Sequence, residues 1–259
     1  ALNQLAMNAP RFIGPALAGV VIAAAGVDVS YYVAGAAYGP VLLFTLLMEV
    51  PSRGTARNPE RTLWSELGDG FRYVAGRRIV LVLLALSLVP TVFGLSFLAI
   101  LPMFADRVLN AGPGGYGLLL SVFGVGAIAG GVVMASLGDF RFKGWFLLGT
   151  AFLFGVFLSG MAIAPWFPVT VAFLLLIGAT GTLYRPVNNA LLLTLTPPEL
   201  HGRVMSMFLL DRGLMPLGSV LAGALADLAN VSVAMVVLGA LCAGLVALAA
   251  VVEPRVRSL

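Results

Sequence analysis

An acid and a base stand side by side at Asp211 and Arg212, inside an otherwise mostly apolar run between residues 204 and 226. Neighbouring side chains of a helix do not face each other, so this is not a self-contained ion pair and each charge needs a partner elsewhere. A charge at the centre of a membrane-spanning helix costs roughly 3 kcal/mol on insertion scales, and such residues usually face the bundle interior, where they mark a pathway or a relay.

We predict that the partner of Asp211 is Arg185. At about 1.5 Å of rise per residue, Asp211 lies ~10 Å and Arg185 ~12 Å inside the same end of two consecutive apolar helices. The matching depths favour an ion pair between them, whereas Arg212 is expected to face elsewhere and to snorkel toward lipid head groups. A purely structural clamp and a coupling or gating role both remain open for the pair.

A polar stripe surrounds Arg185. Tyr184 with Asn188, and Arg185 with Asn189, are neighbours four residues apart on one helix. Such a stripe is the best candidate for a binding site in the chain. The alternative is that its amides merely form hydrogen bonds between helices.

Another apolar run carries Ser87 and Thr91 one turn apart, followed by Ser96. Pro90 lies between the first two and frees a backbone carbonyl, because proline has no N–H to donate. These hydroxyl groups are further candidates for a polar cavity wall, with the same structural alternative as the stripe.

The elements that must position these residues are membrane helices. Hydrophobic residues make up 60% of the chain and charged residues only 10%, against roughly a quarter charged in an ordinary globular domain. The apolar runs contain Gly and Pro but do not alternate with polar residues, which favours an all-α helical bundle over a barrel. We expect eight spanning helices, centred on residues 3 to 25, 30 to 50, 79 to 104, 115 to 136, 145 to 164, 168 to 193, 204 to 226 and 230 to 252.

The positive charges predict the topology. Eleven of the fifteen Lys and Arg residues fall in alternate connections, and Arg107 alone lies in the opposite set. This positive-inside pattern places both termini and the long connection of residues 51–78 in the cytoplasm. The net charge of +4 therefore reflects topology, and nucleic acid is not an expected partner.

Motifs for metal or nucleotide chemistry are missing from the sequence. The stretch GVGAIAGG (124–131) lies in mid-span without a preceding strand, so its Gly126 and Gly130 predict close helix packing instead of a dinucleotide loop. The only histidine, His201, lies in a loop, whereas a membrane enzyme would need clustered His, Asp or Glu. We expect no enzyme activity, no cofactor and no metal.

An internal repeat organises the chain. Residues 14–27, GPALAGVVIAAAGV, align with residues 218–231, GSVLAGALADLANV, which places six spans in the repeat unit. We expect residues 1–50 to be the last two helices of an N-terminal six-helix half, and 79–259 to be the C-terminal half. Residues 51–78 join them as a cytoplasmic linker, with an amphipathic helix after Asn58 and Pro59 or, alternatively, a solvated linker. The chain opens directly in a helix without an initiator Met, so we expect a fragment.

Three stretches carry a family resemblance: RFIGPALAG (11–19), ELGDGFRYV (66–74) and PPELHGRVMSMF (197–208). They resemble the major facilitator superfamily, in the branch of bacterial effluxers similar to the enterobactin exporter and macrolide efflux proteins. The resemblance covers the whole chain as helices five to twelve. His201 stands where arginine is usual. The loop LGDFRFKGW (137–145) approximates the cytoplasmic gating motif of the superfamily, which implies gating residues at Gly138, Asp139, Arg141 and Lys143.

The resemblance also implies where substrate binds, because the first and fourth helices of each half line the cavity in this superfamily. The third and sixth apolar runs of this chain would then supply the substrate-cavity residues Ser87, Thr91, Ser96, Tyr184, Arg185, Asn188 and Asn189. Arg11, Asp211 and Arg212 would be coupling or conformational residues, and Arg11 is equally a candidate for substrate contact. A cavity with Arg185 favours substrates with negative or hydrogen-bond-accepting groups.

The function expected from these observations is secondary active efflux of a small amphipathic compound, such as a drug or siderophore, by alternating access. Proton antiport is implied by the resemblance. The expected partners are membrane lipid, the small-molecule substrate, protons and the missing N-terminal helices of the same chain. The alternatives are a non-transporting scaffold or receptor of the same fold and a lysophospholipid flippase.

Overall fold

The computed structural model describes residues 28–29, 31–47, 74, 76–138 and 140–259. These residues form helices joined by short connections, and no strand occurs within them. The all-α membrane bundle that the sequence predicts is therefore confirmed. The first apolar run, the amphipathic helix before Val74, Arg11 and Asp139 lie outside the described residues.

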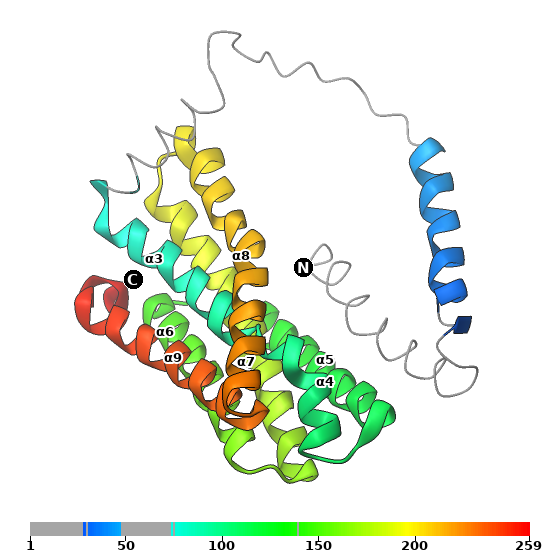
Figure 1. The fold of residues 1–259 in the computed structure, drawn as a ribbon. Helices are drawn as coiled ribbons and strands as arrows, with labels where there is room; N and C mark the ends of the chain where they lie inside the picture. Colours follow the sequence, from blue (N-terminus) through cyan, green and yellow to red (C-terminus); the bar gives the residue numbers. More distant parts are fainter. Residues whose placement is uncertain (1–27, 30, 48–73, 75, 139) are drawn as a thin grey trace.

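Six helical segments in the described residues are long and apolar enough to cross a membrane, and they match the last six predicted runs within a few residues. The first crossing, Arg78–Arg107, consists of α3 (Arg78–Val89), η1 (Pro90–Gly94) and α4 (Phe97–Arg107). The other five are α5 (Gly112–Leu137), α6 (Lys143–Ile163), α7 (Phe167–Leu195), α8 (His201–Leu228) and α9 (Val231–Val252). The short helices η2 (Pro198–Leu200) and η3 (Pro254–Ser258) follow α7 and α9. The second predicted run contains a shorter apolar helix, Tyr31–Leu47, which is exposed along its length and stands apart from the bundle in Figure 1.

Local sequence explains how several of these helices begin. Pro113 and Pro168 lie in the first two positions of α5 and α7, where the missing proline N–H has no helical partner to lose. Asn230 caps α9, because its side-chain oxygen accepts a hydrogen bond of 2.8 Å from the N–H of Val233. The most extensive contacts join α5 to α7, α6 to α9 and α6 to α7, so helices that are not consecutive also pack together.

The first crossing is interrupted at Pro90. Since proline cannot donate to the carbonyl four residues earlier, the regular hydrogen-bond ladder stops there. The chain passes through the π-turn η1, in which the N–H of Leu95 donates to the carbonyl of Pro90 over 2.8 Å. Such π-turns are frequent at functional sites, and this one brings Thr91 to the middle of the bundle.

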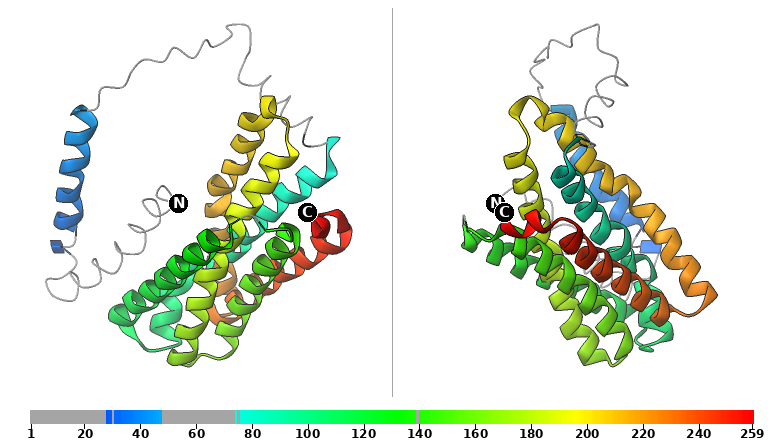
Figure 2. Two further views of the ribbon diagram at one scale, coloured as in Figure 1. Left: turned by 180° about the vertical axis from the view of Figure 1, so that it is seen from behind. Right: turned by 90° about the vertical axis from the view of Figure 1, so that its left-hand side faces the viewer.

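Small residues allow the closest helix contacts. Gly126 and Gly130 of α5 lie directly against the backbone of α7 at Leu175 and Ala179, where a side chain would collide with main-chain atoms. The close packing predicted for the 124–131 stretch is therefore confirmed. Gly155 of α6 approaches α9 in the same way, and Figure 2 shows these helices side by side from two directions.

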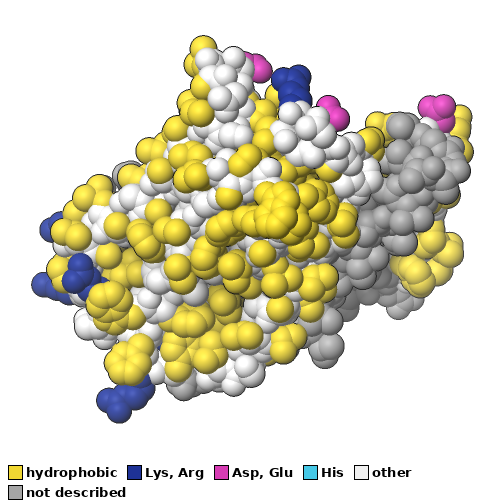
Figure 3. Space-filling view, turned by 90° about the horizontal axis from the view of Figure 1, so that it is seen from below, with side chains coloured by type: hydrophobic (Ala, Val, Ile, Leu, Met, Phe, Trp, Pro, Cys, Tyr) yellow, Lys and Arg dark blue, Asp and Glu magenta, His cyan; other side chains and the backbone are white. Residues whose placement is uncertain are grey.

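The buried apolar side chains form two clusters toward opposite ends of the bundle. The α4-end cluster contains Phe97, Phe104, Phe154 and Leu174, and the α3-end cluster contains Leu83, Leu86, Leu191 and Val204. On α8 the clusters are separated by the stretch from Phe208 to Ala222, which begins just before Asp211. Polar residues thus occupy the middle of the bundle. Much of the outer surface is hydrophobic, with Lys and Arg at the edges of the face in Figure 3, as expected for helices in lipid.

Candidate functional site

The centre of the site is an ion pair between α7 and α8. One terminal nitrogen of Arg185 donates to Oδ1 of Asp211 over 3.0 Å, and the other lies 3.0 Å from Oδ2. This two-pronged geometry matches the fork of a guanidinium to both oxygens of a carboxylate, which is the strong form of such a pair. The Asp211 side chain is 0% exposed, whereas that of Arg185 is 24% exposed. The predicted Asp211–Arg185 interaction is confirmed.

Two further side chains support the pair. The hydroxyl of Thr91, on η1, lies 3.4 Å from Oδ2 of Asp211 and also within 2.9 Å of the carbonyl of Ser87. Cζ of Arg185 lies 5.1 Å from the ring centre of Phe208, one turn before Asp211 on α8, in a cation–π arrangement. Asp211 therefore joins three segments of the chain, α7, α8 and η1.

A cavity of about 220 Å³ lies beside the pair. Its polar wall includes Thr91, Tyr184, Arg185 and Arg212, so two guanidinium groups reach it. Its other wall is apolar. The residues that line it come from η1 to α4, α5, α7 and α8: Thr91, Leu95, Leu98, Leu120, Phe123, Ala127, Gly178, Gly181, Thr182, Tyr184, Arg185, Arg212 and Met215.

The position of Arg212 corrects the sequence prediction. We expected its side chain to point away toward lipid head groups, but it is exposed and lines the cavity. The reason lies in the placement of α8. Because neighbouring residues diverge around a helix, the direction that takes Asp211 into the bundle takes Arg212 to the cavity beside it.

The other predicted cavity residues do not line this cavity. Ser87 and Ser96 are buried and donate within their own segment, to the carbonyls of Leu84 and Val92. Asn188 donates to the carbonyl of Leu83 over 3.0 Å and so ties α7 to α3.

Two amide side chains of α7 have an oxygen without a partner among the described residues. The side-chain oxygens of Asn188 and Asn189 are buried without a hydrogen-bond partner. Because the side-chain nitrogen of Asn188 donates to Leu83 on α3, the structure supports for this residue the alternative of hydrogen bonding between helices.

The residues of the apolar cavity wall were not predicted from the sequence. Leu95, Leu120, Phe123 and Met215 line the cavity, and Phe208 contacts Arg185. These residue types fill every part of a membrane helix, whether it faces lipid, core or cavity. Only Phe208 carried a usable signal, because it lies one turn from Asp211 on the same helix.

The connections at the α3 end contain the residues predicted for cytoplasmic gating, and that role stays a prediction. Gly138 ends α5 with a φ of 60°, Arg141 is exposed, and Lys143 begins α6. His201, at the start of α8, places Nε2 3.0 Å from the carbonyl of Leu193 and 2.8 Å from that of Thr196. Since two carbonyls face this nitrogen, it carries the proton and fastens the end of α7.

The whole sequence, residues 1–259, matches the family described as transmembrane secretion effectors, a group of major facilitator proteins. The chain belongs to this family. Its helical crossings are thus those of part of a major facilitator protein. The six helices of residues 78–252 and the family together identify a multi-pass bacterial membrane protein.

Curated relatives are transporters. The chain is 24% identical to the staphyloferrin A transporter of Staphylococcus aureus over 233 residues, which is 87% of this chain and 56% of that protein. It is 26% identical to the multidrug efflux pump Tap of Mycolicibacterium fortuitum over 264 residues, which is 99% of this chain and 63% of the pump. It is 27% identical to the pump Tap of Mycobacterium tuberculosis over 253 residues, or 93% of this chain and 59% of the pump.

The chain thus spans between 56% and 63% of the length of these relatives. No solved structure matches it significantly. The named relatives are transporters and pumps and not enzymes, which agrees with the absence of an enzymatic motif from the sequence.

Proposed function

We propose that this chain forms helices five to twelve of a secondary transporter that exports small amphipathic compounds by alternating access. The observation that carries this proposal is the cavity bounded by Thr91, Tyr184, Arg185 and Arg212 on one side and by apolar side chains on the other. Such a cavity holds a compound with both an apolar body and a polar group. The name of the multidrug efflux pump Tap supports this direction of transport, and that of the staphyloferrin A transporter supports a small-molecule substrate.

The two arginines of the cavity differ in what they offer a substrate. Asp211 already neutralises Arg185 at 3.0 Å, whereas no acid within the described residues pairs with Arg212. Arg212 is therefore the group that attracts a negative or hydrogen-bond-accepting substituent. Leu95, Leu120 and Phe123 contact the apolar body of the substrate.

The Asp211–Arg185 pair is the coupling element of the proposal. It links α8 to α7 and, through Thr91, to the π-turn of the first crossing. A proton that neutralises Asp211 weakens the pair, and the helices on either side then gain freedom to move relative to each other. If each export step alternates with protonation and deprotonation of Asp211, the protein acts as a proton antiporter.

The cavity favours a transporter over a scaffold or receptor. A scaffold requires only that the stripe of residues 184–189 pack against neighbouring helices, as Asn188 does on α3. Tyr184 and Arg185 instead reach an open space of about 220 Å³. The lysophospholipid flippase is a special case of the same transporter, and lipid substrates belong in its test.

The proposed orientation follows the positive-inside rule. Arg141, Lys143, Arg203 and Arg255 lie at the ends of α5 to α9 that face the cytoplasm in this proposal. The membrane is the bacterial plasma membrane, both termini are cytoplasmic, and the preceding four helices complete the N-terminal half. Residues 1–50 and 51–78 then have the roles expected from sequence.

The test is export by the whole protein in proteoliposomes, measured with two fluorescent amphipathic dyes of similar size. One dye carries a carboxylate and the other a quaternary ammonium. Arg212→Gln is expected to raise KM for the carboxylate dye roughly tenfold, the loss of one charge-assisted hydrogen bond, with little change for the ammonium dye.

Arg107→Gln is the matched control, because it removes the same charge from an exposed position at the end of α4. If Arg212→Gln and Arg107→Gln changed KM for the carboxylate dye equally, Arg212 would not belong to the binding site. A folded protein that moves neither dye nor a lysophospholipid would support the scaffold.

A further inference from the structure

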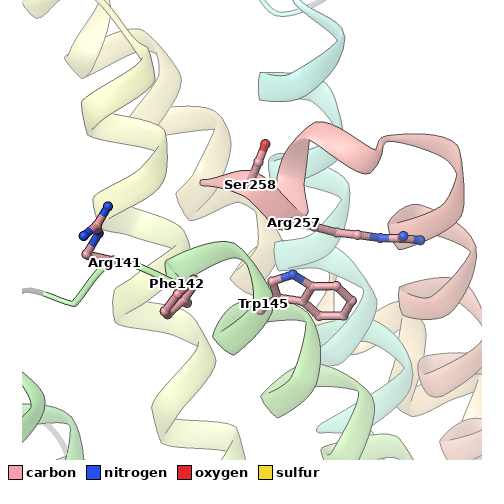
Figure 4. A pocket seen from close by; sticks show the side chains of 5 residues that line it. All are labelled: Arg141, Phe142, Trp145, Arg257 and Ser258. Atoms are coloured by element: carbon pink, nitrogen blue, oxygen red, sulfur yellow. The ribbon is translucent and has the colours of Figure 1, made fainter.

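A second pocket lies on the surface where α6 begins, away from the central cavity. It has a volume of about 500 Å³ and is lined by Arg141, Phe142, Trp145, Arg257 and Ser258. Figure 4 shows that these side chains come from the α5–α6 connection, from the first turn of α6 and from η3. Residues far apart in the sequence thus line one pocket, with Arg141 beside Phe142 at one side and the Arg257 side chain reaching over Trp145 at the other.

Arg257 is held in this pocket without a carboxylate. Its Cζ lies 5.6 Å from the ring centre of Trp145, and its Nε is buried without a hydrogen-bond partner. The nearby acid Glu253 pairs instead with Arg78 at 3.3 Å and with Arg255 at 3.9 Å. Since no carboxylate or carbonyl in the described part of the chain holds this guanidinium, the ring of Trp145 is its main support, and its terminal N–H groups are left for a ligand.

The backbone fixes the position of Arg257. Val256 is fully buried, and its carbonyl lies directly against Gly144, where a side chain on residue 144 would collide with it. The N–H of Gly144 also points to the carbonyl of Leu259 over 3.4 Å. Since η3 is fastened to the first turn of α6, the distance between Arg257 and Trp145 is a built feature and not a chance contact of long side chains.

The second arginine of the pocket is also available. Arg141 is exposed, and no acid within the described residues pairs with it. It lies just before the N-terminus of α6, whose first N–H groups favour negative charge. The pocket therefore has a guanidinium at each of two sides.

The surroundings show which kind of anion fits. Phe142 and Trp145 are 71% and 57% exposed at the rim. Below them the exposed face of α6 continues through Phe152, Leu153 and Val156, at the spacing of one helix face. Gly149 lies on this path with open space where a side chain would stand. An apolar track thus leads from the positive pocket into the hydrocarbon region.

We propose that this pocket binds the phosphodiester head group of an anionic phospholipid, with its acyl chains along the exposed face of α6. Arg257 contacts the phosphate through its outer N–H groups, Arg141 adds a positive charge at the other side of the pocket, and Trp145 lies at head-group level, where indole rings are enriched. A soluble phosphate compound would use the arginines but not the apolar track. The site depends on the membrane placement of the chain and not on the proposed export function, so the two can fail separately.

The first test measures lipid binding to the whole protein by native mass spectrometry. The probes are phosphatidylglycerol and phosphatidylcholine with identical acyl chains. The double variant Arg141→Gln/Arg257→Gln is expected to lose roughly 30-fold in affinity for phosphatidylglycerol, with phosphatidylcholine unchanged. Arg255→Gln is the matched control, because it removes a charge from the same short helix outside the pocket. An equal loss in the control, or no loss in the double variant, overturns the proposal.

The second test locates the lipid and does not depend on any arginine variant. Trp145 is the reporter in a Trp64→Phe/Trp166→Phe background, which removes the other two tryptophans. Phosphatidylglycerol brominated near the top of its acyl chains is expected to quench Trp145 more strongly than the brominated phosphatidylcholine. Equal quenching by the two lipids contradicts the site. Relief of quenching by millimolar glycerophosphoglycerol, a soluble head group, contradicts the choice of lipid over a free phosphate compound.

Discussion

Two arginines of this protein show how environment decides the use of one chemical group. Arg185, between two apolar clusters, has both terminal nitrogens on the carboxylate of Asp211. Arg257, at the end of the bundle, stacks on Trp145 and keeps a buried Nε without a partner. In the membrane interior the protein must supply the counter-charge itself. At the interface the protein need not supply a carboxylate, because head groups and water reach the outer N–H groups of the guanidinium.

The largest expected effect comes from breaking the interior pair. Arg185→Gln leaves Asp211, which is 0% exposed, without its counter-charge and is expected to destabilise the fold by about 3–5 kcal/mol. Asp211→Asn is expected to cost less, because Arg185 is 24% exposed and faces the cavity. The measurement is unfolding of the whole protein in detergent.

The double variant Arg185→Gln/Asp211→Asn is the control for this prediction. It removes both charges and should be more stable than Arg185→Gln alone, since no buried charge remains unpaired. If the effects of the single variants simply add, the two residues do not stabilise each other, and the contrast with Arg257 disappears.

The next effect separates the two arginine sites. Gly144→Ala adds a methyl group against the carbonyl of Val256 and should displace η3 at a cost of about 1–3 kcal/mol. Phosphatidylglycerol binding should fall with it, while export by the central cavity is retained. Gly149→Ala is the matched control for stability, because open space surrounds that position. Loss of export in Gly144→Ala would mean that the sites are not independent.

A smaller effect tests the third segment at the interior pair. Thr91→Val removes the hydroxyl that lies 3.4 Å from Asp211 and should cost about 1 kcal/mol of stability. Thr180→Val is the matched control, because its hydroxyl reaches only carbonyls of its own helix, at 2.7 and 3.2 Å. Equal losses in thermal unfolding for the two variants would show that the contact with Asp211 contributes nothing.

The smallest effect is a difference in salt dependence. Raising the salt concentration from 0.1 to 1 M shortens the screening length from about 10 Å to about 3 Å. Phosphatidylglycerol binding at Arg141 and Arg257 should weaken several-fold, as for exposed charges. The stability difference between the Asp211→Asn variant and the unmodified protein should hardly change, because the pair is buried. If this stability difference did change with salt, the Asp211–Arg185 pair would be in contact with bulk water.

The sequence alone predicts the crossings and the interior pair for physical reasons. The runs from residue 79 onward contain few charges, so their hydropathy locates the helices of the structure within a few residues. Asp211 could be assigned to Arg185 because both needed a partner at the same depth and few charges were available. The structure adds the distances between the two side chains, which the sequence could not give.

The rest depended on three-dimensional placement. Sequence could not tell that Arg212 lines the cavity, because the rotation of α8 is set by packing and not by hydropathy. Asn188 clamps α7 to α3, although its residue type and spacing suit a cavity equally well. The pocket of Arg257 requires η3 to fold back on Gly144, a contact that no local sequence pattern predicts. The roles of Arg11 and Asp139, outside the described residues, remain predictions.

The most direct test of the account is the pH dependence of export by the whole protein carrying Asp211→Asn. Asn cannot take up the proton that would release Arg185, so the account predicts a slower export rate that no longer responds to pH. Asp227→Asn, an exposed position farther along α8, is the control and should behave like the unmodified protein. An Asp211→Asn variant that exports at the unmodified rate with the same pH dependence would contradict the coupling role of the pair.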